Sequence, residues 1–345
     1  MRRYTSLLLM AFALFLIVLA GSAYLAGADD AREQRPMREV IAYTTLPAAQ
    51  VERLSDEYER VSRVRVNFVP LSQGDILRRL KERESGQGKA PAVVLADRET
   101  MDRAAEMGAF IPYVSESGDA VAENFKEPNG LWIGVWYDPV IFCVNRDYLR
   151  QQVILPDTWV KLSQMNARIG VTDFLAADAS ANLLISMIGQ YGDAAAYQIW
   201  RDIHPHVVQY AKYLSNPVRQ AGMGEVDISV AVQSETLRYL NDGYPLKIIY
   251  PADGTAYMLS GTGITKSTQA EQTAAAQAFA DWLLTDEAQQ VLQRNGFYFL
   301  PTNPGTLAYK SFSGKNLVLY DQMVRFTPEQ RHDLLDRWVK YIRLK

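Results

Sequence analysis

Cysteine and histidine are nearly absent from this chain. Its 345 residues include one cysteine, Cys143, and three histidines. A single cysteine excludes an internal disulfide framework and a cysteine metal cluster, and the apolar run VIFCVN predicts that this thiol is buried. His204 and His206 flank a proline, but no neighbouring residue completes a coordination set, so histidine-based zinc chemistry is not expected.

The chain also lacks the short motifs of several enzyme classes. It contains no G-x-S-x-G, P-loop or H-E-x-x-H sequence, and no nucleophile is paired with a base. There is no basic excess, because 36 basic and 39 acidic residues give a formal net charge of −3. A nucleic-acid partner is therefore not expected. These absences weigh against an enzyme, and no cofactor is predicted.

The first 28 residues are an apolar leader. Two arginines precede an uncharged run that starts at Leu7, and Ala-Gly-Ala at residues 26–28 offers a cleavage site. This pattern predicts a secretory signal peptide, with an uncleaved membrane anchor as the alternative because the run approaches spanning length. Residues 29–37 are expected to form a flexible leader. The rest of the chain should be periplasmic or otherwise extracytoplasmic.

Strands alternate with helices after the leader. Strands are predicted for residues 39–43, 64–69 and 91–95, and helices for residues 48–62, 76–85 and 98–107. Strands separated by helices pair in parallel, so this part of the chain is expected to form an α/β lobe. The next strand region, residues 132–145, is predicted to break at Asp138-Pro139.

The second half of the chain repeats this plan. Strands are predicted for residues 168–172 and 227–232, with a helix after each, and one long helix is predicted from about Gln269 to Asn295. Between them, residues 246–250 form an apolar strand that stops at Pro251. This stretch, up to Lys266, is interpreted as a crossing between two lobes, with an ordinary turn at a sheet edge as the alternative.

Several segments occur in an informative order along the chain. The amino-terminal half contains VIAYTTL, APAVVLADRETMDRAAEMGAFIPY and LWIGVWYDPVIFCVN, and the other half contains GEVDISVAV, NDGYPLKIIYPADGT, AFADWLLTDEAQQVL and QRHDLLDRWVKYI. Together they resemble the solute-binding proteins of ABC importers, in particular the ferric-iron, phosphonate and sugar-phosphate branch. The resemblance covers roughly residues 38 to 345.

This resemblance implies a periplasmic-binding-protein type II fold. In that fold two α/β lobes, each a mixed sheet with helices on both faces, are joined by two hinge strands. Lobe I would comprise residues 38–136 plus 257–308, and lobe II residues 137–256 plus 309–345. The implied protein is a monomer whose partners are a small ligand and an ABC permease in the membrane.

Five loops follow the carboxyl ends of predicted strands, where ligands bind in open α/β sheets. Facing each other across two lobes, these loops would line one cleft. Their candidate ligand-binding residues are Thr44, Thr45, Asp97, Ser180, Ala181, Asn182, Gln233, Ser234, Glu235, Asp253, Gly254 and Thr255. Arg98 is expected to be a surface arginine at a helix start, with pairing to an anion as the alternative.

The loop Ser180-Ala181-Asn182 resembles the Ser-Gly-Thr loop that many members of this family use to bind an anion. Free backbone N–H groups and the helix dipole at a helix start favour a negative group. A simple helix N-cap is the alternative interpretation of the same residues.

Iron is where the sequence departs from the family pattern. Ferric-binding members place two adjacent tyrosines after the strand that corresponds to residues 227–232, where this chain has Ser234-Glu235-Thr236. Thr44-Thr45 replaces a common histidine, while Asp97 keeps the acidic position. A small organic anion, such as a phosphonate or sugar phosphate, is therefore the leading ligand. Fe(III) is the alternative, and metal binding stays open.

The resemblance implies an importer component that captures its ligand by hinge closure. One alternative keeps the binding but reports the ligand to a membrane sensor kinase, a role that would suit an uncleaved anchor. A second alternative is an enzyme on the same two-lobed architecture.

Overall fold

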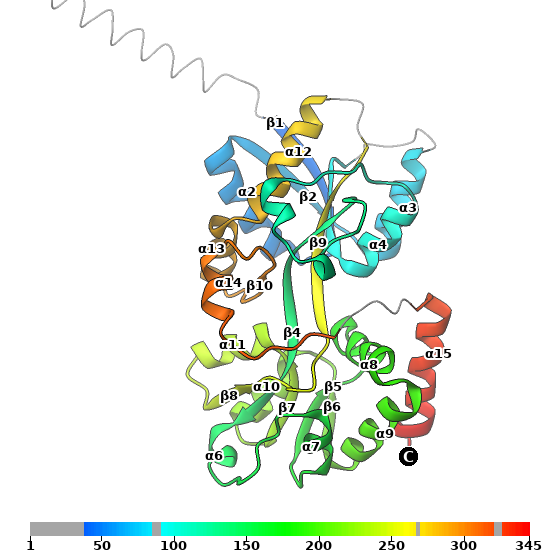
Figure 1. Ribbon diagram of the computed structural model, residues 1–345, viewed down its shortest axis with the longest axis vertical. Coiled ribbons are helices and arrows are strands. Elements are labelled where there is room, and N and C mark those ends of the chain that lie inside the picture. Colours follow the sequence, from blue (N-terminus) through cyan, green and yellow to red (C-terminus); the bar gives the residue numbers. More distant parts are fainter. Residues whose placement is uncertain (1–37, 85–90, 267–269, 321–325) are drawn as a thin grey trace, which may run out of the picture.

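The computed structural model describes residues 38–84, 91–266, 270–320 and 326–345. The predicted signal peptide and leader therefore lie outside the described residues. Two lobes lie one above the other, and the strands β4 (Ile133–Asn145) and β9 (Tyr257–Ile264) run between them (Figure 1). Within the described ranges, no helix is both long and apolar enough to cross a membrane.

The first lobe has a mixed sheet with the strand order β2-β1-β3-β9-β4-β10. Its parallel strands are β1 (Arg38–Thr44), β2 (Val64–Pro70) and β3 (Val93–Asp97), and β10 (Leu300–Pro301) lies at the edge. Its helices and turns are α2 (Ala48–Ser62), α3 (Gln73–Glu84), α4 (Arg98–Glu106), α5 (Glu116–Asp119), η1 (Glu123–Phe125), α12 (Ala270–Leu283), α13 (Asp286–Arg294) and α14 (Leu307–Phe312).

The second lobe has the strand order β8-β4-β7-β5-β6. Its other strands are β5 (Ile169–Thr172), β6 (Val207–Ala211), β7 (Ile228–Val232) and β8 (Leu246–Ile249). Its helices are α6 (Arg146–Leu149), α7 (Trp159–Gln164), α8 (Asp178–Tyr191), α9 (Asp193–Ile203), η2 (His204–His206), α10 (Ser215–Gly222), α11 (Gln233–Asn241), α15 (Pro328–Trp338) and the π-helical η3 (Val339–Arg343). The predicted two-lobed α/β fold, with a mixed sheet in each lobe, is confirmed.

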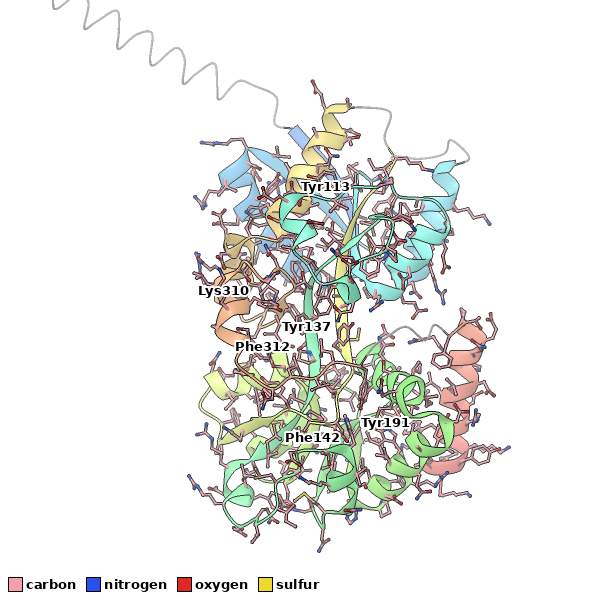
Figure 2. The ribbon with its side chains drawn as sticks, in the orientation of Figure 1. Tyr113, Tyr137, Phe142, Tyr191, Lys310 and Phe312 are labelled. Atoms are coloured by element: carbon pink, nitrogen blue, oxygen red, sulfur yellow. The ribbon has the colours of Figure 1, made fainter. Side chains whose placement is uncertain are left out.

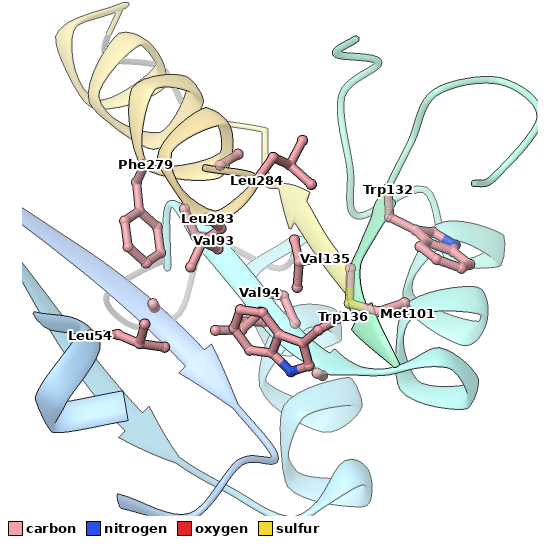
Figure 3. Packing of buried hydrophobic residues seen from close by; sticks show 14 of the residues in the cluster. Leu54, Val93, Val94, Met101, Trp132, Val135, Trp136, Phe279, Leu283 and Leu284 are labelled. Atoms are coloured by element: carbon pink, nitrogen blue, oxygen red, sulfur yellow. The ribbon is translucent and has the colours of Figure 1, made fainter. Parts of the chain in front are cut away.

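Each lobe has its own hydrophobic core. Phe279 and Leu283 of α12 pack in the first core with Val93 of β3 and Trp136 of β4 (Figure 3). Separate clusters fill the second lobe on the two faces of its sheet. Because burying apolar side chains is the main favourable term in folding, two separate cores would allow the lobes to move relative to each other at little cost in buried area.

Strand β4 corrects one prediction, because it does not break at Asp138-Pro139 but runs for 13 residues through both sheets. Tyr137 is the last residue to pair with β10, and Val140 is the first to pair with β7. Pro139 is still in register with Tyr257 of β9, but toward the other neighbours of β4 it lies between the β10 and β7 pairings, where its missing N–H leaves neither without a donor. The proline therefore occupies the point where the strand passes from one lobe to the other.

The predicted long helix from Gln269 to Asn295 is also corrected, because α12 ends at Leu283 and α13 begins at Asp286. The side chain of Thr285 accepts a hydrogen bond from the N–H of Ala288, which caps α13. A threonine followed by Asp286 and Glu287 is an ordinary helix-start signal, and it separates two helices that share an apolar periodicity.

The chain crosses between lobes a third time after α14. Phe312 packs against the first core, whereas Tyr320 is buried in the second. The resemblance placed this crossing at residues 308/309, so the structure moves α14 to the first lobe. Leu317 and Leu319 also pack against the first core, and we accordingly propose that lobe II regains the chain at Tyr320.

Candidate functional site

A cleft of about 320 Å³ lies between the lobes. Helix α4 of the first lobe forms one wall, helices α8 and α15 of the second lobe form the other, and β9 joins them (Figure 1). The side chains that line it with charge or hydrogen-bonding groups are Asp97, Arg98, Glu99, Asp102, Arg103, Glu106, Asn182, Ser186, Tyr257, Thr327 and Arg331.

The start of α4 brings two predicted loops together. Parallel pairing of β1 with β3 places their carboxyl ends side by side, and the hydroxyl of Thr45 accepts a hydrogen bond of 3.2 Å from the N–H of Asp97. The Asp97 carboxylate caps α4, because it accepts bonds from the N–H (2.9 Å) and the hydroxyl (2.7 Å) of Thr100. Buried Thr44 accepts a bond from the N–H of Leu46.

Arg98 presents its guanidinium to this cleft. It donates to the Tyr257 hydroxyl and to the Asn124 carbonyl, each at 3.3 Å, and lies 3.8 Å from the Asp102 carboxylate. The surface position expected for Arg98 is therefore not what the structure shows, because its side chain lines the cleft. Its guanidinium therefore adds hydrogen-bond donors in a planar fork to this wall of the cleft.

The wall from the second lobe combines two helices that lie far apart in the sequence. Asn182 of α8 accepts a hydrogen bond of 2.6 Å from Arg331 of α15, and its amide lies 3.2 Å from the sulfur of Met258. The sequence predicted Asn182 but missed Arg331. The periodic signal was present, because Arg331, Leu334 and Trp338 share one helical face, and the latter two are buried in the second core.

Ser180 and Ala181 do not form the anion-binding loop that the resemblance suggested. Helix α8 begins at Asp178, so both residues lie within its first turn. Their N–H groups already bond to the Ala177 carbonyl at 3.1 and 3.0 Å, and the Ser180 hydroxyl donates to the carbonyls of Asp173 and Ala177. These donors are consequently committed to the protein itself, and of the three residues Asn182 is the one that lines the cleft.

Gln233, Ser234 and Glu235 lie at the start of α11, beside the hinge, and do not contribute to the cleft lining described above. The N–H and hydroxyl of Ser234 donate to the Asp138 carboxylate at 2.9 and 2.5 Å. Burial raises the pKa of the Asp138 carboxyl to about 7, although the Ser234 bonds oppose that rise. Gln233 accepts a bond from Tyr250, and Glu235 pairs with Arg238. This loop ties the hinge strand to the second lobe.

Asp253, Gly254 and Thr255 form a turn inside the second lobe and likewise lie outside that lining. The Asp253 carboxylate accepts the N–H of Trp159 at 3.0 Å, and the Gly254 carbonyl accepts the indole N–H of the same tryptophan at 2.9 Å. The Thr255 hydroxyl donates to the Val140 carbonyl. Gly254 has a φ of +95°, a conformation that favours glycine. The hydrogen bonds of this turn therefore fix the position of Trp159 within the second lobe.

Tyrosines gather at the hinge rather than after β7. Tyr137, which lies on β4 between the lobes (Figure 2), packs against Phe125 and Tyr257 at ring distances of 4.9 and 6.0 Å. Burial raises the pKa of the Tyr137 phenol, which opposes the phenolate form that Fe(III) prefers. In the ranges that the structure describes, no group of three or more His, Cys, Asp and Glu side chains is arranged to hold a metal ion.

Comparisons with known proteins agree with this architecture. The family model of bacterial extracellular solute-binding proteins matches residues 40–298. A Haemophilus influenzae protein of uncharacterized function is 25% identical over 339 residues, which cover 95% of this chain and 96% of that protein.

Solved structures of periplasmic binding proteins are also similar. AfuA from Actinobacillus pleuropneumoniae, solved with fructose 6-phosphate, shares 21% identity with a TM-score of 0.69, over 90% of this chain and 100% of that one. A Bordetella ferric binding protein shares 19% identity with a TM-score of 0.70, over 87% of this chain and 98% of that one.

Proposed function

Because the chain belongs to the family of bacterial extracellular solute-binding proteins, we propose that it captures a small organic anion, a phosphonate or a sugar phosphate, between its lobes. Its place is the periplasm, where it acts as a monomer and delivers the ligand to an ABC permease in the membrane. The likeness to AfuA, whose structure contains a sugar phosphate, supports this ligand class.

The observation that carries the proposal is the set of guanidinium groups in the cleft. Arg98 and Arg103 come from α4, and Arg331 comes from α15 on the opposite wall. A phosphate or phosphonate group accepts several charge-assisted hydrogen bonds, and planar guanidinium groups are well suited to donate them in pairs. An anion between Arg98 and Arg331 would connect the two lobes.

The carboxylates of the cleft favour a ligand with more than an anionic group. Asp97, Glu99, Asp102 and Glu106 lie on the same helix wall as Arg98 and Arg103. Carboxylates repel a bare anion but accept hydrogen bonds from hydroxyl or ammonium groups. A sugar phosphate or an aminoalkyl phosphonate supplies both kinds of group, so these ligands fit the wall better than inorganic phosphate does.

Hinge strands β4 and β9 give the proposed closure its mechanical basis. The two lobes keep separate cores, and ligand contacts to both walls favour the arrangement in which the walls are close. Scavenging from dilute solution requires micromolar affinity or better, which corresponds to about −8 kcal/mol or more favourable.

Thermal unfolding with a panel of ligands tests the proposal. Glucose 6-phosphate, 2-aminoethylphosphonate, inorganic phosphate and ferric citrate are added separately, and the first two are expected to raise the unfolding midpoint. Arg98→Gln should reduce that rise, whereas Arg337→Gln, in the same helix as Arg331 but paired with Asp193 of its own lobe, should leave it unchanged.

The same panel separates the alternatives. A midpoint shift with ferric citrate, and with neither organophosphorus compound, would assign Fe(III) and overturn the anion proposal. A result without any shift would remove both ligand classes.

A further inference from the structure

Among the described residues, an ion pair between Arg331 and Glu99 crosses the cleft. The Nε of Arg331 on α15 lies 3.5 Å from a carboxylate oxygen of Glu99 on α4. The other oxygen of Glu99 accepts a hydrogen bond of 2.7 Å from Arg103, one turn further along α4. Glu99 therefore holds a cation of each wall, one from its own helix and one from the opposite lobe.

Arg331 is firmly part of the second lobe. Leu334 and Trp338, three and seven positions further along the same helical face, are buried in the second core. The Arg331 guanidinium also donates to Asn182 of α8 at 2.6 Å. Helix α15 lies beside the second lobe (Figure 1), and Pro328 and Arg331 near its start line the cleft. Movement of the lobes therefore changes the Glu99–Arg331 distance directly.

The Glu99–Arg331 pair lies where a ligand can reach it and replace Glu99 as the partner of Arg331. Both residues line the cleft of about 320 Å³, and their side chains keep 22% (Arg331) and 33% (Glu99) of their exposure. A guanidinium binds carboxylate and phosphate oxygens with the same donors. A phosphate-bearing ligand that reaches Arg331 consequently competes with the Glu99 carboxylate.

We propose that Glu99 is an internal lock: its carboxylate holds Arg331 of the opposite lobe in the empty cleft, and an incoming oxyanion displaces it. This inference rests on the proposed function for the identity of the displacing group. This lock keeps the two lobes of the ligand-free protein near each other. It also lowers the affinity for the anion, because binding must first break the pair between Glu99 and Arg331.

Two substitutions expose the lock. Glu99→Gln keeps the shape of the side chain but removes its charge, so the empty protein should open and the affinity for glucose 6-phosphate should rise about two- to fivefold. Arg331→Gln should open the empty protein similarly but weaken binding, because the same guanidinium serves the ligand. The double variant should open no further than either single variant.

Interlobe distances measured by electron paramagnetic resonance provide the test. Spin labels at Arg53→Cys in α2 and Ala195→Cys in α9 lie on exposed positions of the two lobes, and native Cys143 is fully buried. Matched controls are Glu82→Gln, an exposed carboxylate on α3, and Arg337→Gln, whose partner Asp193 is in its own lobe. All distances are recorded without ligand and then with glucose 6-phosphate or inorganic phosphate.

The expected result is a longer or broader distance distribution for Glu99→Gln and Arg331→Gln without ligand, with both controls unchanged. Distributions for Glu99→Gln that match the wild type would overturn the lock. If the distances change as expected but neither phosphate compound binds, the lock stands and the anion assignment of the proposed function falls.

Discussion

The two walls of the cleft are built in different ways. The first-lobe wall is a single helix, α4, which follows directly from β3 and is capped by Asp97. The second-lobe wall joins α8 to α15, and its contact between Asn182 and Arg331 spans 149 positions of sequence. One wall therefore depends on local structure, whereas the other depends on how well the carboxyl-terminal helix docks on its lobe.

The largest expected effect comes from undocking that helix. Trp338 is fully buried, with ring contacts to Phe174 at 4.7 Å and Tyr210 at 5.5 Å. Trp338→Ala should lower the free energy of unfolding by about 3 to 5 kcal/mol and weaken ligand binding through the second wall. Urea unfolding measures the first effect and calorimetry the second. Tyr341→Ala, at a half-exposed position, should change neither quantity.

The hinge between the walls should respond to pH through Asp138. Its folded pKa of about 7 lies above the ordinary 3.8, so the folded protein keeps this proton longer than the unfolded chain does. This pKa difference stabilises the folded protein by at most roughly 4 kcal/mol. The contribution is complete below about pH 3.8 and is lost as the pH rises through about 7. Asp138→Asn should remove this slope.

Urea unfolding of the wild type and Asp138→Asn at pH 5, 6, 7 and 8 measures how the free energy of unfolding depends on pH. The difference between the two proteins reports Asp138, because the other titrating groups are common to both. Parallel slopes for the two proteins would contradict the buried, proton-binding hinge carboxyl.

A substitution of intermediate effect tests the cleft wall that α4 forms. Arg98→Gln should weaken glucose 6-phosphate binding about tenfold, the size expected for losing a hydrogen bond from a charged donor. Isothermal titration provides the affinity. Arg79→Gln, which removes an exposed arginine of α3 stacked on Tyr43, is the matched control. Equal losses in both variants would show a general charge effect instead of a specific contact.

The smallest effect concerns the turn at Asp253. Asp253→Asn should cost about 1 kcal/mol of stability through a weaker bond to the Trp159 N–H, while leaving ligand affinity unchanged. A loss of affinity without a loss of stability would return this turn to the binding site and would contradict its assignment to the structure of the second lobe.

The sequence was sufficient for those features that depend on neighbouring residues. Asp97 and Thr45 were expected to meet because each follows a strand end, and parallel pairing of β1 with β3 brings them together; Asp97 lines the cleft, whereas Thr44 and Thr45 lie outside its lining. The position of Arg331 in the cleft was not predictable in that way, because it results from the burial of Leu334 and Trp338 in a distant core. No local motif marks such a docking event.

Other errors came from the limits of local signals. Ser180 and Asn182 lie two positions apart, and this rotation of roughly half a helix turn points the first into the lobe and the second into the cleft. Pro139 was expected to end a strand, but it falls between two ladders where no donor is needed. Orientation along a helix and pairing along a strand are set by tertiary partners.

The most direct test of the account is calorimetric titration of the wild type, Arg98→Gln and Arg331→Gln with glucose 6-phosphate and 2-aminoethylphosphonate. We expect micromolar or tighter binding of at least one compound by the wild type, and a loss of about tenfold or more in each variant, since one arginine comes from each wall. Binding that is unaffected by both substitutions, or no binding to the wild type, would contradict an anion held between the two lobes.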